Sequence, residues 1–313
     1  MPRAPPLATR LYVANANNVN NLNEMKLIAD SGSTKTAWCL VSDDGRQERI
    51  STQGINPYHQ TEADIVSALR TELLPALCEG RLPQAAAQLD VFFYGAGCTP
   101  EASPRVASAL QQVFGAGTQA HVESDMLGAA RALCRHDAGI VAILGTGSNS
   151  CLYDGKRIVA NVSPLGYILG DEGSGAYIGK RLVGDVLKRQ LPDDVCRLFL
   201  EETQLTAADI VRRTYSEPLP NRFLASLSPF CARHRSEPAV HRLLLDCFRQ
   251  FFRRNISAYS ASQVGMQGPL KVHFVGSVAY HYRDEIRTVA SDMGYAVGNV
   301  LSAPIEGLID YHT

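Results

Sequence analysis

The sequence has little that would tie the protein to a membrane, to nucleic acid or to an oxidising compartment. It contains no apolar run of the roughly 20 residues needed to cross a bilayer, and its first 24 residues lack the apolar core of a signal peptide. Thirty basic residues balance thirty-one acidic ones without a basic cluster, so we expect no nucleic-acid partner. The eight cysteines include no Cys-x-x-Cys pair, which indicates free thiols in a reducing cytoplasm.

The length and composition favour two globular domains. The chain has 313 residues and 45% hydrophobic content, enough for more than one core. A strand-like run begins directly at Met25, so we predict that residues 1–24 are a disordered extension. We expect an N-terminal domain at 25–136 and a C-terminal domain with a helical insertion at 137–302. A terminal helix at 303–313 is expected to pack back on the first domain.

Two stretches of the chain open in the same way. Residues 25–53 are predicted to form a strand, a small-residue turn, a strand, an Asp-Gly turn and a strand, and residues 139–162 repeat this order. Strands and helices alternate after the first stretch. The pattern indicates an internal duplication of an α/β unit, with the turns at 30–36 and 145–150 in equivalent places.

The stretch between residues 174 and about 273 is predicted to be mostly helical. Within it, the run "FRQFFRRN" at 248–255 is interpreted as part of an amphipathic core helix. Helix breaks are predicted at five prolines: Pro192, Pro218, Pro220, Pro229 and Pro238.

The two turns have the composition of phosphate-binding loops. Gly, Ser and Thr allow several backbone N–H groups to converge on one anion. Each turn alone is more simply an ordinary hairpin turn, but two matching turns in duplicated halves would face one cleft. Asp30 would repel a phosphate unless a cation intervened, so we interpret it as a Mg²⁺ partner that acts through water, with Lys35 as the opposing positive charge. Neither turn completes a Walker A or G-x-G-x-x-G motif.

Three segments together resemble a known superfamily. "IADSGSTKTAWCLV", "ILGTGSNSCLY" and "FVGSVA" are similar to the phosphate-1, phosphate-2 and adenosine motifs of the sugar kinase, Hsp70 and actin superfamily. Within it, "LGTGSNS" followed by "PLGYILGDEGSGAYIGKRLV" resembles the N-acetylglucosamine kinase branch of the BadF/BadG/BcrA/BcrD ATPase family. The resemblance spans nearly everything from Met25 to His312. It implies an α/β fold of two ribonuclease-H-like (actin-like ATPase) domains with a nucleotide cleft between them.

The resemblance also implies which residues bind ATP and which one acts as the base. The catalytic aspartate falls on Asp125, where a predicted strand ends and a helix begins. Judged from the residues alone, a helix cap formed by Ser124 or Asp125 is favoured over a catalytic base, because acidic residues are enriched in first helical turns. The nucleotide-binding set lies in the two turns and the adenosine motif: Gly32, Ser33, Thr34, Lys35, Thr36, Gly145, Thr146, Gly147, Gly276 and Ser277.

Sugar binding is implied for a second set: Asn56, Asp125, Thr146, Asn149, Gly166 and Asp171. Two of these residues also fit a purely local role, because Asn56 precedes Pro57 in a turn and Asp171 lies near the start of a helix. Many related kinases have a tryptophan near Gly166, where this chain has Leu165 and Tyr167. That departure leaves the pocket for an acyl group undetermined.

The predicted function is that of an ATP- and Mg²⁺-dependent kinase. It would transfer the γ-phosphoryl group of ATP to a hydroxyl of an amino sugar, with the 6-hydroxyl of N-acetylglucosamine favoured, and with glucosamine and N-acetylmuramic acid as alternatives. A BadF-type ATPase that activates a redox partner is the competing interpretation. Such activators hold an iron–sulfur cluster with cysteines, and clustered cysteines are lacking here. Related kinases often form dimers, so a homodimer is considered.

A third interpretation is a sensor that binds a sugar or a nucleotide without turnover. The presence of Asp30, Lys35 and Asp125 favours catalysis instead, because a sensor needs no base and no cation partner.

Overall fold

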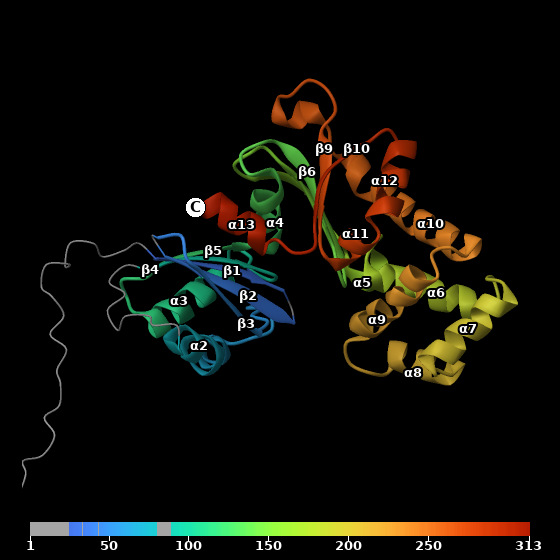
Figure 1. The fold of residues 1–313 in the computed structure, drawn as a ribbon, viewed down its shortest axis with the longest axis horizontal. Coiled ribbons are helices and arrows are strands. Elements are labelled where there is room, and N and C mark those ends of the chain that lie inside the picture. Colours follow the sequence, from blue (N-terminus) through green and yellow to red (C-terminus); the bar gives the residue numbers. More distant parts are fainter. Residues whose placement is uncertain (1–24, 33, 43, 80–88) are drawn as a thin grey trace, which may run out of the picture.

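The protein folds into two α/β lobes (Figure 1). The computed structural model describes residues 25–32, 34–42, 44–79 and 89–313. Two of the predictions, the extension at 1–24 and the role of Ser33, therefore fall outside the described residues.

The first lobe is built on a five-stranded sheet with the order β3-β2-β1-β4-β5. Its strands are β1 (Met25–Ser31), β2 (Lys35–Val41), β3 (Gln47–Gln53), β4 (Leu89–Gly95) and β5 (Gln119–Ser124). The first three form an antiparallel meander, whereas β4 and β5 run parallel to β1. Alternate residues of β1 face opposite sides of the sheet, so Leu27 and Ala29 enter one core and Ile28 enters another.

One face of this sheet is covered by a nearly continuous helical segment and by α3 (Ser103–Phe114). The segment consists of α1 (Glu62–Ala68), a π-helical turn (Leu69–Leu73) and α2 (Leu74–Glu79). It begins at a capping box, in which the Thr61 side chain accepts a hydrogen bond from Asp64 N and the Asp64 carboxylate accepts one from Thr61 N.

The second lobe repeats the first. Its sheet has the order β8-β7-β6-β9-β10, with the same antiparallel and parallel pairs as the first sheet. The strands are β6 (Gly139–Leu144), β7 (Ser148–Tyr153), β8 (Ile158–Val162), β9 (Lys271–Val275) and β10 (Ala296–Leu301). The predicted duplication and the α/β fold class are confirmed.

The second lobe also carries the predicted helical region. Its helices are α5 (Gly166–Leu169), α6 (Gly175–Leu187), α7 (Asp193–Thr203), α8 (Ala207–Tyr215), α9 (Pro220–Arg233), α10 (Pro238–Arg254), α11 (Ser277–His281) and α12 (Arg283–Asp292). Short 3₁₀ turns follow α10 at Ile256–Ala258 and Ala261–Val264. As predicted, α10 is amphipathic and buries Phe248, Phe251 and Phe252. Among the described residues, no helix combines the length and the apolar character that a membrane span requires.

One proline prediction is wrong. Pro192, Pro220 and Pro238 lie at helix starts, but Pro229 lies inside α9. A proline at 229 cannot donate to the carbonyl of Ala225, four residues earlier. The hydroxyl of Ser228 donates to that carbonyl instead, at 2.9 Å, and the helix continues.

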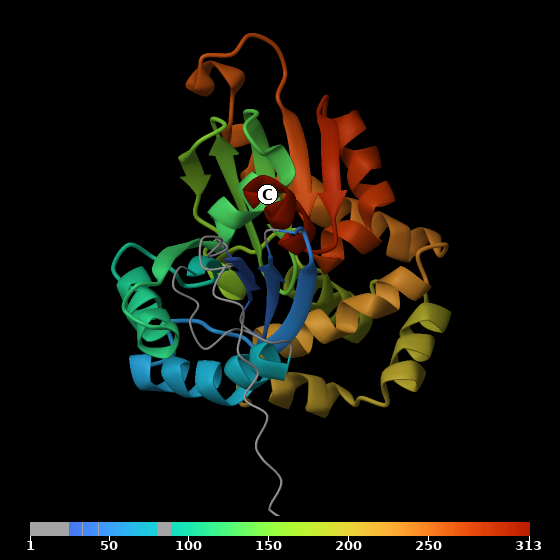
Figure 2. The ribbon, with the colours of Figure 1, turned by 60° about the vertical axis from the view of Figure 1, so that its left-hand side comes forward.

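Two helices lie between the sheets of the two lobes, as both Figure 1 and Figure 2 show: α4 (Asp125–Cys134) and α13 (Ile305–His312). Helix α4 packs Met126 and Ala129 against the second sheet, and α13 packs Leu308 against Ile28 of the first. The chain enters the second lobe after α4 and returns to the first through α13. Both connections between the lobes therefore pass through this helix pair.

Candidate active site

The candidate site begins where the parallel strands of the first sheet end. The register of the sheet aligns Ser31 with Gly95 and Gly95 with Ser124. Asp30 directly precedes Ser31 and Asp125 directly follows Ser124, so both residues lie at the same edge of the sheet. Ser124 caps α4 by accepting a hydrogen bond from Leu127 N at 3.2 Å. Of Ser124 and Asp125, the two residues considered as caps of this helix, Ser124 is therefore the N-cap.

The two carboxyl groups at this edge influence each other. The pKa of Asp30 is raised to about 7, mainly by burial and secondly by the negative charge of Asp125. The positive charge of Lys35 lowers this pKa. Burial also raises the pKa of Asp125, although its carboxylate accepts a hydrogen bond from Met126 N at 2.8 Å. Both residues keep partial access to solvent. An arrangement of this kind favours either a proton or a cation between the carboxylates.

The first turn is supported from inside the protein by hydroxyl groups. The turn closes with a hydrogen bond from Gly32 N to Lys35 O at 3.0 Å. Beneath it, the hydroxyls of Ser31 and Thr36 lie 2.7 Å apart, and both side chains are fully buried. Thr36 Oγ1 donates to Gln53 O at 3.0 Å. The Thr36 hydroxyl is therefore bonded inside the protein, and this arrangement does not support the predicted contact between its side chain and a nucleotide.

The second turn has the same form and carries a carboxylate. Gly145 N donates to Gly147 O at 2.9 Å, and Ser148 N donates to Asp171 Oδ1 at 3.2 Å. A Cβ atom at Gly147 would stand 3.0 Å from Asp171 Oδ2, so a larger residue there would crowd this carboxylate. The first turn of α6 is anchored on the same turn by a bond from Gly175 N to Gly145 O at 2.8 Å. Asp171 thus lies directly beside the predicted phosphate-binding turn.

One cavity of about 550 Å³ joins the two turns. Its lining includes Thr34 from the first turn, Gly145 and Thr146 from the second, and Ser277 from the adenosine motif. Gly276 precedes Ser277 with a φ of 117°, and a Cβ atom there would lie 2.3 Å from Leu144 O. These predicted nucleotide-binding residues, from distant parts of the chain, therefore meet at a single space.

Sequence reasoning missed the far wall of this cavity. That wall comes mainly from α9 and α11 and includes Arg222, Ala225, Ser226, Ser228, Pro229, Ala232, Arg233, His281 and Tyr282. The sequence offered no signal for them, because α9 has the same amphipathic pattern as any helix packed on a core. The wall contains arginine and histidine side chains and no carboxylate.

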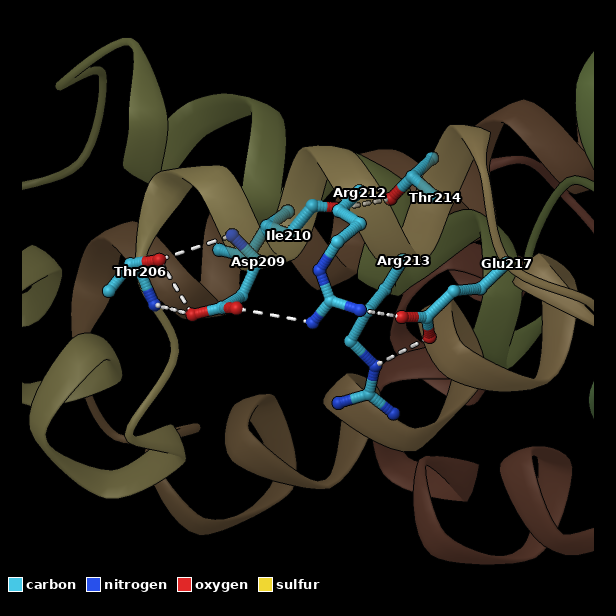
Figure 3. Close-up of polar contacts among 7 residues, drawn as sticks. All are labelled: Thr206, Asp209, Ile210, Arg212, Arg213, Thr214 and Glu217. Carbon is cyan, nitrogen blue, oxygen red and sulfur yellow. Dashed lines mark hydrogen bonds and ion pairs between the residues drawn. The ribbon is translucent and has the colours of Figure 1, made fainter.

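Figure 3 shows the contacts that hold the segment before α9. Arg212 bridges the carboxylates of Asp209, at 3.2 Å, and Glu217. Arg213 lies 3.7 Å from Glu217 and stacks over the ring of Phe223 in α9, 4.1 Å from its centroid. This network connects the end of α8 to the helix that forms the cavity wall.

Of the predicted sugar-binding residues, Thr146 lines that cavity and the others do not. Asn56 Oδ1 accepts a hydrogen bond from Tyr58 N at 2.9 Å, so the residue makes the turn that was considered as its alternative role. Asn149 Oδ1 accepts one from Asn161 Nδ2 at 2.9 Å. Gly166 opens α5 with a φ of 73°.

The carboxylates fit the modest requirements of a magnesium site. No group of three or more His, Cys, Asp or Glu side chains in the described part of the chain could enclose a metal ion. Asp30 and Asp125 nevertheless offer oxygen ligands at the same sheet edge, and a divalent cation would offset the negative charge of Asp125 that acts on Asp30. Mg²⁺ commonly binds in this way, through one or two carboxylates, water and substrate phosphates.

Comparisons with known proteins agree with this geometry. Residues 29–191 match the model of the BadF/BadG/BcrA/BcrD ATPase family. A provisionally named N-acetylglucosamine kinase from Porphyromonas gingivalis is similar in structure, with 49% identity, a TM-score of 0.83, and coverage of 92% of this chain and 98% of that one. No curated protein sequence matches the chain.

More distant structures share the fold alone. A provisionally named N-acetylglucosamine kinase from Chromobacterium violaceum has 18% identity and a TM-score of 0.70, with 93% of this chain and 100% of that chain covered. A ROK hexokinase from Thermus thermophilus has 14% identity and a TM-score of 0.51, with 92% and 98% covered.

Proposed function

This chain belongs to the BadF/BadG/BcrA/BcrD ATPase family, and we propose that it is an ATP-dependent kinase that phosphorylates N-acetylglucosamine on its 6-hydroxyl. One observation carries the proposal. The turns at Thr34 and at Gly145–Thr146 line the same cavity as Ser277, and the carboxylates of Asp30 and Asp125 lie at the sheet edge beside the first turn.

In the proposed reaction, Asp125 acts on the sugar hydroxyl. Its carboxylate accepts the hydroxyl proton as the oxygen attacks the γ-phosphorus, and ADP leaves. A raised pKa suits this role, because a base is most effective when its pKa approaches the working pH. Backbone N–H groups of the two turns and Lys35 would hold the phosphates in line for transfer. When bound, Mg²⁺ supplies charge neutralisation on the phosphate oxygens, and Asp30 is the residue that would hold it through water.

The activator interpretation requires cysteines that can reach a cluster at a subunit interface. The cysteines whose side chains the structure describes are instead free and buried: Cys39, Cys98, Cys134, Cys151, Cys196, Cys231 and Cys247. Their burial supports the kinase proposal over the activator. Free thiols also support a cytoplasmic location, which is part of the proposal.

The proposal also includes a homodimer. Light scattering of the purified protein measures this oligomeric state.

A coupled ADP-release assay tests the function. The acceptors are N-acetylglucosamine, glucosamine, N-acetylmuramic acid and glucose, and ³¹P and ¹³C NMR of the product identify the phosphorylated hydroxyl. We expect ADP release that depends on N-acetylglucosamine and gives the 6-phosphate. Preference for another amino sugar would change the substrate assignment, and ADP release that no sugar stimulates would contradict the kinase proposal.

A further inference from the structure

The segment 164–171, here termed the sugar loop, carries two of the proposed sugar contacts, Gly166 and Asp171. It bends sharply, because Leu165 and Gly166 have φ values of 61° and 73°. Two internal hydrogen bonds close it, from Gly170 N to Gly166 O at 2.8 Å and from Asp171 N to Pro164 O at 2.9 Å. Its local shape is therefore determined, but these bonds do not fix it to the lobe.

Of the large apolar side chains in the sugar loop, packing attaches one to the lobe. Tyr167 packs partly against the core of the second lobe. The other large apolar side chains are mostly exposed: Leu165 (61%), Ile168 (70%) and Leu169 (70%). A loop with so little buried apolar surface needs a polar attachment to keep its position.

At the end of the loop, Asp171 Oδ1 accepts a hydrogen bond from Ser148 N at 3.2 Å, and near the middle of the loop Lys180 provides a second polar attachment from α6. Its Nζ donates to Tyr167 O at 2.7 Å, in the middle of the sugar loop. The ammonium also lies 5.2 Å from the centroid of the Tyr177 ring, on the same helix. Burial lowers the pKa of Lys180, while the negative charges of Glu172 and Asp171 support its protonated form. The same cation thus contacts the sugar loop and acts on the carboxylate at the loop's end.

We infer that Lys180 is a positioning residue for the sugar, which fixes the sugar loop on α6 and balances the charge of Asp171. The inference rests on the proposed function, since it assigns to the sugar loop the acceptor of that reaction. Removal of the ammonium would free the Tyr167 carbonyl and take away the positive charge that acts on Asp171, while Glu172 would keep its ion pair with Arg254. Sugar binding would weaken more than ATP binding, because Lys180 contacts the sugar loop directly and acts on the second turn only through Asp171, which accepts a hydrogen bond from Ser148 N.

The kinetic test compares Lys180→Met, Lys180→Arg and the control Arg181→Met. The neighbouring Arg181 is half-exposed and lies 4.0 Å from Asp185, so its loss removes a cation from the same helix without touching the loop. For Lys180→Met we expect a rise in the KM for N-acetylglucosamine of about tenfold or more, as for the loss of a hydrogen bond from a charged donor, and a clearly smaller rise in the KM for ATP. Arginine should restore most of the affinity, because it can donate to the same carbonyl.

The pH profile supplies a readout that a purely structural role would not move. The charged groups that act on Lys180 are Glu172, Asp171, Arg181 and the Cys247 thiol. Because the pKa of Lys180 is lowered, its charge is lost at a lower pH than that of an ordinary lysine. In the wild type, the KM for the sugar should rise as the pH is raised through this range. In Lys180→Arg it should stay constant.

Hydrogen–deuterium exchange tests the positioning without any turnover. We expect faster exchange in peptides covering 164–171 for Lys180→Met, and wild-type rates for Lys180→Arg and Arg181→Met. An unchanged exchange rate, an unchanged KM for the sugar, or an equal rise in both KM values without recovery by arginine would each overturn the inference. A wild type that phosphorylates no sugar would refute the proposed function alone, and the exchange rates would still decide whether Lys180 holds the loop.

Discussion

Asp30, at the end of β1, and Asp125, at the start of α4, interact electrostatically although 94 residues separate them in the sequence. Burial, and next this repulsion, raises the pKa of Asp30 to about 7. The two residues come to the same edge of the sheet because β1, β4 and β5 are parallel and end there. The first two predictions follow from this pair.

Replacing Asp125 with Asn should abolish most phosphoryl transfer while substrate binding remains. Asparagine keeps the size of the side chain but cannot accept the hydroxyl proton, so we expect kcat to fall by about 10²- to 10⁴-fold. Calorimetry should give nearly unchanged affinities for ATP and for N-acetylglucosamine.

Ser124→Ala is the matched control for this substitution. It removes the α4 cap at a cost of about 1 kcal/mol in the free energy of unfolding but leaves the base in place. Near-normal turnover in Asp125→Asn would remove Asp125 from the mechanism.

Replacing Asp30 with Asn should stabilise the protein at high pH and inactivate it. The folded pKa of Asp30, about 7, lies above its usual value of 3.8, so the folded state binds more protons between these pH values. The carboxylate consequently destabilises the fold as the pH rises from about 4 to 7. The melting temperature of Asp30→Asn should exceed that of the wild type by an amount that grows over this interval and then levels off. A constant difference across the interval would contradict the assigned pKa.

Replacing Gly307 with Ala should loosen the helix pair between the lobes. A Cβ atom at Gly307 would stand 2.3 Å from Ala132 O in α4, so α13 must move away. We expect a loss of about 1–3 kcal/mol in the free energy of unfolding, measured in urea. Gly184→Ala in α6 meets no atom within 4 Å and should be neutral or stabilise the protein by up to about 1 kcal/mol. Equal effects of the two substitutions would contradict this account of the packing.

The contact between α13 and the first sheet should weaken in acid. Tyr94 Oη lies 2.8 Å from His312 Nε2, and the His312 ring stacks on Phe92 with centroids 3.9 Å apart. Burial lowers the pKa of His312 from 6.5 to about 4, assisted by the charge of Arg131 and then of Lys26. Between these pH values the unfolded chain binds more protons, so the free energy of unfolding should fall as the pH drops from about 6.5 to 4.

His312→Phe separates this effect from that of the other histidines. The variant keeps an aromatic ring but cannot be protonated, so it should be less stable at neutral pH and lose less stability in acid. If the two stability curves are parallel from pH 4 to 7, His312 is not the group responsible.

Local patterns account for the elements that the sequence predicted well. The alternation of residues in β1 and β2 and the turn residues between them act over a few positions, so the meander and its repeat at 139–162 could be recognised without coordinates. Pro229 was misjudged because its effect depends on Ser228, whose hydroxyl replaces the missing donor. Thr36 belongs to a motif, but whether its hydroxyl faces a ligand or the interior depends on Gln53, a partner on another strand.

By itself, the sequence determined the duplicated strand order, the two glycine-rich turns and the residue types available for chemistry, because these depend on neighbours along the chain. Only the tertiary structure decided that Thr34, Thr146 and Ser277 line one cavity, that α9 provides its far wall, and that Lys180 donates a hydrogen bond to Tyr167 O. Those relationships depend on how two sheets and the helices between them pack, and packing joins residues whose separation in the sequence carries no information about their distance in space.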